Sequence, residues 1–575
     1  MERDRKIVEL KDLSFTYPGG EGRALSDICL EMWEGDEFVV WMGHTGAGKS
    51  TLAYCLNALI PSFIRGELVG KARVLSKDIF LSRTSEMSRE VGLVLQDFEA
   101  QLFSTNVELE IAFGMENMGV PREEMRRRID ELLPLVRLEG MREREPSTLS
   151  GGQKQRLAIA SVLAMRPHLL VMDEPTTDLD PVGKEEVFQL ARRLRGRGMA
   201  MLLIEHETEE ALQADRVILL KEGRILREGP PREVLSDGRL LLEAGIAPLS
   251  VTEFFRRALG PLSPERTLPL TSEEAITEFE RSLRLREAAA HILEEKDQKG
   301  MGARRVVLKV EGVRYHYPSG VEALKGVDLE IREGEFVALV GQNGSGKTTL
   351  AKHLNGLLRP TSGRLETFGE DAKGLSVKEL GRRVGYCFQN PDHQIFAPTV
   401  FEEVAFGPRN LGFWGEELKG NVDEALAAVN LTGYEDRDPF ALTKGERQRV
   451  AVASVLAVKP QVLILDEPTT GLDHLQQRSM MEMVSSLNKK GHTILIITHS
   501  MSTVARYAHR TVVLDQGRVT MDDTTRKVFS REEKLERCFL RPPPIVRLGN
   551  RLGITPLTVE EMLEVVEPLN RQEGG

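Results

Sequence analysis

The sequence contains few cysteines and no long apolar run. Its four cysteines, Cys29, Cys55, Cys387 and Cys538, form no CxxC pair, so the spacing expected of a zinc or iron–sulfur site is missing. Scattered thiols of this kind are typical of a reducing compartment. The N-terminal MERDRKIVELKD has no apolar signal core, and no apolar run approaches the ~20 residues that span a bilayer. We therefore expect any work at a membrane to be done from the water side, through a partner.

The sequence also lacks an excess of positive charge. Lys and Arg number 77 against 88 Asp and Glu, for a net charge of −11, which gives no electrostatic reason to expect a nucleic-acid partner. Hydrophobic residues make up 41% and charged residues 29% of the chain, a balance typical of globular proteins. A length of 575 residues is too great for one core, so it predicts at least two large domains.

A repeat runs the length of the chain. LSGGQKQRLAIASVLA, which begins at Leu149, returns as LTKGERQRVAVASVLA at Leu442, and Gln96 and Gln389 have the same separation (389 − 96 = 293). A period this long indicates a duplicated domain rather than a solenoid. Each copy also ends in a PLTxEE segment, which we interpret as a small helical tail used twice. The charged stretch 276–300 between the copies predicts a helix that runs into a flexible joint.

Each copy alternates apolar runs with helical patterns. VELKDLSFTY and DEFVVWMG predict strands and KSTLAYCLNALI predicts a helix, while HLLVMDE and AMLLIEH have the near-continuous apolar pattern of buried parallel strands. VLILDE and TILIITH repeat that pattern in the second copy. Strands that alternate with helices predict an α/β fold with parallel sheets.

Both copies carry a phosphate-binding loop. GHTGAGKS (43–50) and GQNGSGKT (341–348) fit G-x-x-x-x-G-K-[ST], and each follows an apolar strand and opens a helix. The glycines allow backbone N–H groups to turn toward phosphate oxygens, and the helix N-terminus adds a positive dipole end. Lys49 and Lys347 would reach the β- and γ-phosphates, and Ser50 and Thr348 would hold Mg²⁺. Two matches in this context argue against a chance Gly-rich turn.

A pair of carboxylates follows in each copy. LLVMDEPTTDLD and VLILDEPTTGLD each end an apolar strand with Asp-Glu. Asp173 and Asp466 can hold Mg²⁺, directly or through water, and Glu174 and Glu467 can polarise a water as general base. The alternative is a polar cap on a strand, and it weakens for two DEPTT segments that each follow a P-loop.

The P-loop, loop glutamine, SGGQ, DEPTT and strand-ending histidine, in this order, resemble the ABC ATPases. The resemblance covers nearly all of the chain except the joint and the tails. It implies two tandem P-loop NTPase domains, each with a RecA-like parallel-sheet core, an antiparallel β subdomain and a helical subdomain, and it implies ATP and Mg²⁺ as cofactors. It makes His206 and His499 the switch histidines that contact the γ-phosphate, and Gln96 and Gln389 the glutamines that meet both Mg²⁺ and a transmembrane partner. The further ATP-binding residues that it implies are Tyr17, Gly43, Gly46, Gly48, Thr51, Tyr317, Gly341, Gly344, Gly346 and Thr349.

ABC domains work as head-to-tail pairs, with ATP between the P-loop of one domain and the signature of the other. The resemblance therefore implies that this chain carries a complete pair. ATP on Lys347 would meet an intact signature, and ATP on Lys49 would meet an altered one. The intact signature is Ser150, Gly151, Gly152 and Gln153, and the altered one is Thr443, Lys444, Gly445 and Glu446. Because Lys444 adds bulk and Glu446 adds negative charge near phosphate, we expect the Lys347 site to carry most turnover; equal activity of both sites is the alternative.

The segment FQNPDHQIFAPTVFEEVAFGPRNLG resembles the corresponding stretch of energy-coupling factor (ECF) ATPases, which drive uptake of vitamins and of cobalt or nickel ions. It implies a peripheral subunit on the cytoplasmic face of the membrane, bound to a transmembrane scaffold with coupling helices and a substrate-binding membrane protein. Apolar Ile395, Phe396, Val400 and Phe401 on a short helix would form a groove wall for a coupling helix; packing within the helical subdomain is the alternative. A conventional importer with fused ATPases and a soluble tandem ABC protein acting on ribosomes or DNA are the other interpretations.

These patterns divide the chain into four parts. We expect ABC ATPase domains at 1–240 and 305–535, a helical tail and linker at 241–304, and a C-terminal helical tail at 536–575. A further hypothesis is that the tails tie the two copies together.

Overall fold

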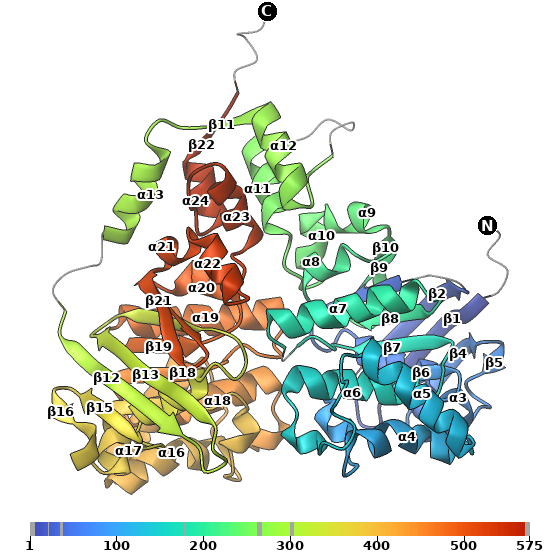
Figure 1. Ribbon diagram of the computed structural model, residues 1–575, viewed down its shortest axis with the longest axis horizontal. Coiled ribbons are helices and arrows are strands. Elements are labelled where there is room, and N and C mark those ends of the chain that lie inside the picture. Colours follow the sequence, from blue (N-terminus) through green and yellow to red (C-terminus); the bar gives the residue numbers. More distant parts are fainter. Residues whose placement is uncertain are drawn as a thin grey trace, which may run out of the picture. The chain divides into compact units, whose positions relative to one another are not determined.

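The chain folds into two compact units, Met1–Thr252 with Asp473–Leu475 and Glu253–Leu472 with Gln476–Gly575 (Figure 1). The structure, a computed structural model, describes residues 6–20, 22–34, 38–177, 179–260, 267–298 and 304–569. The joint expected near residue 300 therefore lies partly outside the described residues, at 299–303.

The first unit is built on a six-stranded sheet whose inner strands are parallel. The strand order is β10 (Arg224–Gly229), β9 (Arg216–Lys221), β3 (Phe38–Met42), β8 (Ala200–Ile204), β7 (Leu169–Asp173) and β6 (Val91–Val94). All residues of β3, β7 and β8 are buried, as continuous apolar strands of a covered parallel sheet are. The carboxyl ends of these three strands bring the P-loop, the Asp-Glu pair and the switch histidine to one edge.

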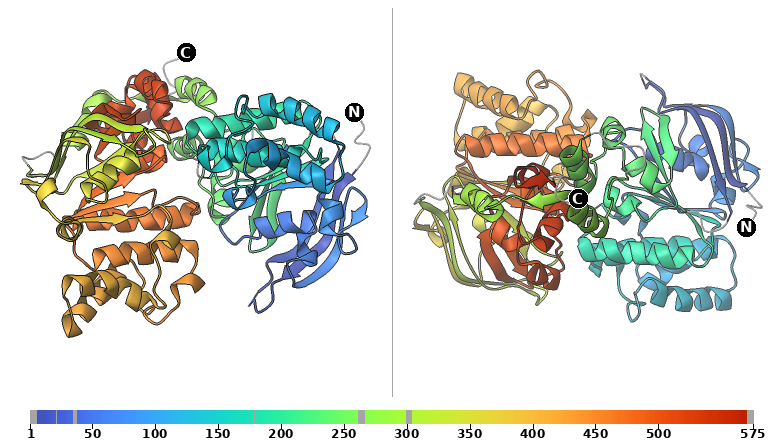
Figure 2. Two further views of the ribbon diagram at one scale, coloured as in Figure 1. Left: turned by 60° about the horizontal axis from the view of Figure 1, so that its bottom comes forward. Right: turned by 90° about the horizontal axis from the view of Figure 1, so that it is seen from above.

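An antiparallel sheet and a helical subdomain complete the first unit. The antiparallel sheet has the order β2 (Leu25–Trp33), β1 (Lys6–Thr16), β4 (Glu67–Val74) and β5 (Lys77–Asp78). The helical subdomain contains α4 (Val107–Asn117), α5 (Arg122–Leu135) and α6 (Gly151–Leu163). Figure 2 shows the blue strands and the cyan helices at separate edges of this unit. Its other helices are α1 (Lys49–Leu56), α2 (Leu59–Ser62), α3 (Thr84–Met87), α7 (Pro181–Arg195), α8 (Thr208–Ala211), α9 (Pro231–Leu235) and α10 (Gly238–Glu243).

The second unit repeats this plan. Its six-stranded sheet has the order β17 (Val384–Cys387), β18 (Val462–Asp466), β19 (Thr493–Ile497), β14 (Phe336–Val340), β20 (Arg510–Asp515) and β21 (Arg518–Thr524). Its antiparallel sheet has the order β13 (Glu322–Arg332), β12 (Val306–His316), β15 (Ser362–Thr367) and β16 (Glu370–Asp371). Its helices include α14 (Lys347–Leu354), α15 (Val377–Arg383), α16 (Val400–Leu411), α17 (Gly415–Ala428), α18 (Lys444–Leu456), α19 (His474–Lys489) and α20 (Met501–Tyr507). The predicted fold class is therefore confirmed.

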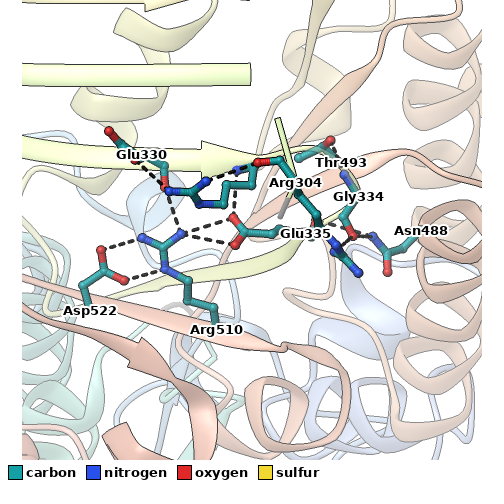
Figure 3. Close-up of polar contacts among 9 residues, drawn as sticks. Arg304, Glu330, Gly334, Glu335, Asn488, Thr493, Arg510 and Asp522 are labelled. Atoms are coloured by element: carbon teal, nitrogen blue, oxygen red, sulfur yellow. Dashed lines mark hydrogen bonds and ion pairs between the residues drawn. The ribbon is translucent and has the colours of Figure 1, made fainter. Parts of the chain in front are cut away.

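A polar cluster fixes the start of β14, the strand that leads into the second P-loop (Figure 3). The guanidinium of Arg510 donates two hydrogen bonds to Asp522, at 2.6 and 2.7 Å, and two more to Glu335, at 3.4 and 3.1 Å. The N–H of Gly334 donates to the hydroxyl of Thr493 at 2.9 Å. Charge-assisted pairs of this kind are stronger than neutral hydrogen bonds, so the turn before β14 is held from several sides.

Tail segments from both copies pack together within the second unit. The segments after the first copy are α11 (Ser250–Leu259), α12 (Ser272–Ser282), β11 (Leu283–Leu285) and α13 (Ala289–Gln298). Those after the second are α21 (Thr525–Phe529), α22 (Glu532–Arg537), α23 (Pro544–Arg551), α24 (Val559–Glu564) and β22 (Val566–Pro568). Helix α12 packs against α23, and β11 pairs with β22 in antiparallel register. Figure 1 shows these green and red segments side by side.

One expectation about this region is wrong. The stretch 276–300 is predicted to be one charged helix that runs into a flexible joint, but α12 ends at Ser282 and the short strand β11 follows before α13 begins at Ala289. The break has a tertiary cause, because Leu283 is buried and Arg284 pairs with Glu567 at 2.7 Å across the β11–β22 ladder. Tertiary pairing here overrides the helical propensity of the flanking residues.

Candidate active site

Each P-loop folds around the ammonium group of its lysine. In the first unit, Lys49 Nζ donates to the carbonyl oxygens of Gly43, at 2.8 Å, and of the next residue, at 3.0 Å. In the second unit, Lys347 Nζ donates to the carbonyl of Gly341 at 2.8 Å and to the next carbonyl at 2.7 Å. Both lysines are buried, and burial lowers the pKa of Lys49. The loops thus place a cation where helices α1 and α14 begin.

Glycine is required at these turns for two reasons. Gly46 and Gly48 adopt left-handed φ angles of 84° and 101°, which L side chains rarely tolerate. A Cβ on Gly43 would lie 2.3 Å from the carbonyl oxygen of Leu220. In the second loop, Gly344 and Gly346 adopt φ angles of 78° and 103°, and a Cβ on Gly341 would lie 2.1 Å from the carbonyl oxygen of Leu514. Both loops therefore have the backbone turn of a glycine-rich phosphate-binding loop.

The aspartates after β7 and β18 lie beside the P-loop hydroxyls. In the second unit, Thr348 Oγ1 donates to Asp466 Oδ2 at 2.9 Å, and the Tyr386 hydroxyl donates to the same oxygen at 2.6 Å. In the first unit, both oxygens of Asp173 are buried and, among the described residues, find no partner of normal hydrogen-bond geometry. Burial raises the pKa of Asp173 to about 6, and the side chain of Ser50 partly opposes this shift. A hydroxyl and a carboxylate form an oxygen-only donor set that fits Mg²⁺.

The first unit brings Glu174 together with a histidine and a glutamine. His206 Nε2 lies 2.5 Å from Glu174 Oε1, and Gln96 Nε2 donates to Glu174 Oε2 at 2.7 Å. Burial alone would raise the pKa of Glu174, but the hydrogen bond and charge of His206, together with the charge of Lys49 and a hydrogen bond from Thr177, leave that pKa lowered. Glu174 also adopts φ 48°, a strained region for a non-glycine residue that is typical of functional sites. The carboxylate is therefore ionised and held.

The second unit places the equivalent groups in a looser arrangement. His499 Nε2 lies 3.1 Å from Glu467 Oε1, and Thr470 Oγ1 donates to Glu467 Oε2 at 3.5 Å. Glu467 has the same left-handed backbone, with φ 47°, and Gln389 lies exposed after β17. Both units thus pair a buried glutamate with the histidine that follows the neighbouring strand.

The two tyrosines expected near the nucleotide base contact the P-loop helices. The Tyr17 hydroxyl lies 3.1 Å from Thr51 Oγ1, and the Tyr317 hydroxyl lies 2.9 Å from Thr349 Oγ1. Both rings stand at the ends of long antiparallel strands, β1 and β12. This contact fixes each ring at the first turn of the phosphate-binding helix.

The two signature segments have the same backbone cap but different side-chain bonding. Ser150 caps α6 by accepting the N–H of Gln153 at 3.4 Å, and Gln153 Oε1 accepts the N–H of Ser150 at 3.0 Å. Thr443 caps α18 by accepting the N–H of Glu446 at 3.3 Å, and its hydroxyl donates to Glu446 Oε2 at 2.7 Å. Tyr434 donates to the other oxygen of Glu446 at 3.0 Å. TKGE is thus a well-formed helix start whose hydroxyl is already engaged.

The groove wall expected in the second copy is only partly exposed. Ile395 and Val400 are buried, Phe401 is half-buried and Phe396 is 60% exposed. Phe396 packs edge-to-face against Phe406, which is also exposed, with ring centroids 4.8 Å apart. Ile395 and Val400 therefore follow the alternative interpretation of the sequence, since they pack within the helical subdomain. The sequence analysis also missed Phe406, because only the folded chain brings this residue into contact with Phe396.

The first unit presents the same aromatic pair. Phe103 and Phe113 pack edge-to-face with centroids 4.5 Å apart, and both are exposed. In each unit a buried glutamate, Glu110 or Glu403, accepts backbone N–H groups of the loop that carries the first phenylalanine. The loop conformation that presents this pair is thus built in the same way twice.

Among the described residues, no helix is both long and apolar enough to cross a bilayer. Residues 25–177 and 324–470 match a family model described as ABC transporter. The chain is 53% identical to an ABC transporter ATP-binding protein of Caldanaerobacter subterraneus subsp. tengcongensis, over 97% of this chain and 98% of that protein. It is 42% identical to another of Methanosarcina acetivorans, over 97% and 92% of the two chains.

Solved structures give matches to single cassettes. CbiO1 from Clostridium perfringens, described as part of the ABC transporter complex cbiONQ, is 36% identical, covers 43% of this chain and 99% of its own, and has a TM-score of 0.38. From the family match at two positions and the relatives that span nearly the whole chain, the protein belongs to the ABC transporter family, as an ATP-hydrolysing, ATP-binding protein with two fused cassettes.

Proposed function

We propose that the chain powers an ECF-type uptake transporter for a vitamin or a transition-metal ion, bound to the cytoplasmic face of the membrane. The observation that carries this proposal is the exposed phenylalanine pair that recurs in both units, Phe103 with Phe113 and Phe396 with Phe406. Exposed large apolar side chains at corresponding places on two domains favour a partner with two similar apolar helices. The partners proposed are a transmembrane scaffold with coupling helices and a substrate-binding membrane protein.

The residues of each site have separate proposed roles. Lys49 and Lys347, with the backbone N–H groups of their loops, bind the β- and γ-phosphates. Glu174 and Glu467 accept a proton from the attacking water, and a lowered pKa keeps Glu174 ionised for that task. His206 and His499 lie within hydrogen-bond reach of these carboxylates, so each can orient its glutamate and contact the γ-phosphate.

The donor sets at Asp173 and Asp466 fit Mg²⁺. Ser50, Gln96 and Asp173 would hold the ion in the first site, and Thr348, Gln389 and Asp466 in the second. When bound, the ion would neutralise phosphate charge that develops during hydrolysis. The tyrosines Tyr17 and Tyr317 would stack on adenine.

We further propose that the two cassettes act as one head-to-tail pair. Each unit contains both a P-loop and a signature helix, so each can supply what the other's nucleotide needs. Nucleotide on Lys347 would then meet Ser150 at the start of α6, and nucleotide on Lys49 would meet Thr443 at the start of α18. A helix N-terminus with a hydroxyl cap is suited to a γ-phosphate.

Reconstitution tests the partner assignment. The chain would be co-expressed with a membrane scaffold and a small substrate-binding membrane protein encoded beside it, and ATP-dependent uptake of vitamins, Co²⁺ and Ni²⁺ into proteoliposomes would be measured. The double variant Phe103→Ala/Phe396→Ala should lower complex formation and uptake by about tenfold or more, since buried aromatic anchors dominate such interfaces. The matched control is Phe63→Ala/Phe539→Ala, because both of these phenylalanines are also exposed.

Three results would contradict the proposal. One is tight binding of a vitamin by the isolated chain. Another is uptake that requires a soluble binding protein, as in a conventional importer. The third is co-sedimentation with ribosomes in place of the scaffold.

For the domain organisation, we propose that the tails at 241–304 and 536–575 are modules separate from the cassettes at 1–240 and 305–535. The support is their shared design: Thr271 caps α12 and Thr558 caps α24 by accepting N–H groups of Glu274 and Glu561. Deleting residues 541–575 should leave β11 without its partner strand and weaken ATP-driven closure of the pair. Unchanged closure and ATPase activity after this deletion would refute the hypothesis that the tails tie the copies together.

A further inference from the structure

A buried acidic cluster lies behind the switch histidine of the first unit. Glu205 follows strand β8 and Glu210 lies on α8, and these side chains are 3% and 9% exposed. The hydroxyl of Thr176, in the DEPTT turn after Glu174, lies 2.7 Å from Glu205 Oε1 and 3.3 Å from Glu210 Oε2. One hydroxyl therefore faces two buried carboxyl groups.

The hydrogen bonding requires a proton on this pair. A threonine hydroxyl has a single hydrogen to donate and can otherwise only accept. Donation to Glu205, the shorter contact, leaves the contact with Glu210 satisfied only if Glu210 is protonated. Burial agrees with this assignment, because it raises the pKa of Glu205 to about 7 and the pKa of Glu210 well above its usual range. Two buried carboxylates this close cannot both ionise at low cost.

The charged groups that face the pair come from several elements. Lys184 on α7 lies 2.5 Å from Glu207 and 3.8 Å from Glu210. Lys184 and Glu207 balance each other and hold the outer side of the cluster. Glu174, after β7, adds negative charge near Glu205, and Lys49 on α1 adds positive charge. The pair thus lies between one balancing cation and the carboxylate of the active site.

Glu205 connects the two loops that carry the reacting groups. Its Oε2 accepts the backbone N–H of His206 at 3.3 Å, and its Oε1 accepts the hydroxyl of Thr176 from the turn that follows Glu174. The same turn and the same switch residue form the His206–Glu174 contact of 2.5 Å. A side chain that bonds both loops restricts how far the histidine can move from the glutamate.

The second unit has neutral residues where the first unit has this charged cluster. At the corresponding repeat positions, Glu205 is replaced by Thr498, Glu207 by Ser500, Glu210 by Thr503 and Lys184 by Gln477, while Thr176 is kept as Thr469. There, the N–H of Ser500 donates to Thr498 Oγ1 at 3.1 Å. Four charged residues are thus exchanged together for neutral ones. The joint exchange indicates that the four act as one unit in the first site only.

We propose that Glu205 is a positioning residue of the first ATP site, which, with Glu210 and one shared proton, holds His206 against Glu174. Loss of the shared proton places two negative charges beside Glu174 and loosens the switch loop. The first site should therefore lose activity at alkaline pH through a group that the second site does not contain.

The test uses the full chain in two backgrounds. Glu467→Gln leaves hydrolysis to the first site, Glu174→Gln leaves it to the second, and single-turnover rates are measured from pH 6 to 9. In the first background, Glu205→Ala should lower the rate by about tenfold, while Glu205→Gln should keep it within about threefold, since the amide oxygen still accepts one of the two hydrogen bonds that Glu205 accepts and the amide does not titrate. Glu205→Gln should also remove the decline of the rate at alkaline pH. Glu209→Gln, an exposed acid on the same helix, is the matched control.

Hydrogen exchange of residues 200–212 gives a second measurement that does not depend on turnover. After correction for intrinsic rates, exchange in the parent chain should increase as pH rises through about 7, and Glu205→Gln should suppress the increase. The proposal is overturned if Glu205→Ala changes neither rate nor exchange, or if Glu205→Gln loses as much as Glu205→Ala with an unaltered pH profile. An equal loss from Glu205→Ala in the Glu174→Gln background would also overturn it. Should Glu205→Ala not fold, the pH profile and exchange of Glu205→Gln decide alone.

Discussion

The hydroxyl of Thr443 donates its only hydrogen to Oε2 of Glu446, 2.7 Å away, at the start of helix α18. The equivalent Ser150 hydroxyl accepts from the N–H of Gln153 and, within the residues that the structure describes, its own hydrogen is given to no acceptor. A phosphate that approached Thr443 would have to displace a carboxylate that already holds the hydrogen. We therefore expect this bond, as well as the charge of Glu446, to make the altered signature a weaker phosphate ligand.

We predict unequal effects from the two glutamates. Glu467→Gln should leave less than about one fifth of the ATPase activity of the assembled transporter, and Glu174→Gln should leave more than about half, because a lost general base costs at least tenfold at the site it serves. Steady-state phosphate release measures both. Equal losses would mean that TKGE is a tolerated variant.

Weakening the bond that engages the Thr443 hydroxyl should activate the Lys49 site. In the Glu467→Gln background, Glu446→Gln replaces the carboxylate oxygen that accepts from Thr443 with a weaker, neutral amide acceptor. It also recreates the cap of the first signature, in which the glutamine oxygen accepts the N–H of the cap residue. Turnover at the Lys49 site should rise by about threefold to tenfold, the range expected for one additional donor to a developing charge. Tyr434→Phe, which removes only the other bond to Glu446, is the control and should have a smaller effect. If Glu446→Gln does not raise turnover, the hydrogen bond between Thr443 and Glu446 is not the cause of the difference between the two sites.

The acidic cluster also predicts how stability depends on pH. Glu205 has a pKa of about 7 in the folded unit against a usual 4.5, so the folded state holds a proton that the unfolded state releases. Stability contributed by this group is present at low pH and is lost as pH rises from about 4.5 to about 7. Relative to Glu205→Gln, the parent chain should lose about 2–3 kcal/mol of unfolding free energy between pH 5 and pH 8. The difference is measured by urea unfolding that is monitored through hydrogen exchange of peptides from the first unit.

Arg526 should be the residue on which tail attachment depends most. Its buried guanidinium donates to Asp297 on α13, to Glu561 on α24 and to the carbonyl oxygen of Thr555. Arg526→Ala leaves two partly buried carboxylates unpaired, so we expect a loss of about 2–4 kcal/mol in the stability of the tail region. Faster hydrogen exchange in residues 283–298 and 555–568 would report it. Arg551→Ala, an exposed arginine on α23, should change little, and equal protection in both variants would contradict the role of Arg526.

The sequence predicted the local parts of the site because local motifs build them. The Gly43–Ser50 turn, the Asp-Glu pair after β7 and the histidine after β8 each follow from a buried strand that ends at one sheet edge. Contacts between distant side chains could not be predicted in this way. The pairing of Phe396 with Phe406 and of β11 with β22 depends on tertiary packing.

The Glu205–Glu210 pair had a signal that was available in the sequence. Aligning IEHETEE with ITHSMST shows the four acids of one copy against two threonines and two serines in the other. What the sequence could not supply was the burial of both carboxyls and the position of Thr176 between them. The sequence pattern alone would fit two acids on the surface, but because both carboxyl groups are buried, the pair shares a proton.

The central claim is that each nucleotide is bound by both cassettes, and an ATP-bound structure of the Glu174→Gln/Glu467→Gln double variant tests it most directly. We predict that the γ-phosphate on Lys347 lies within hydrogen-bond distance of Ser150 at the start of α6. A γ-phosphate enclosed entirely by residues of its own unit in that ATP-bound state would contradict the account.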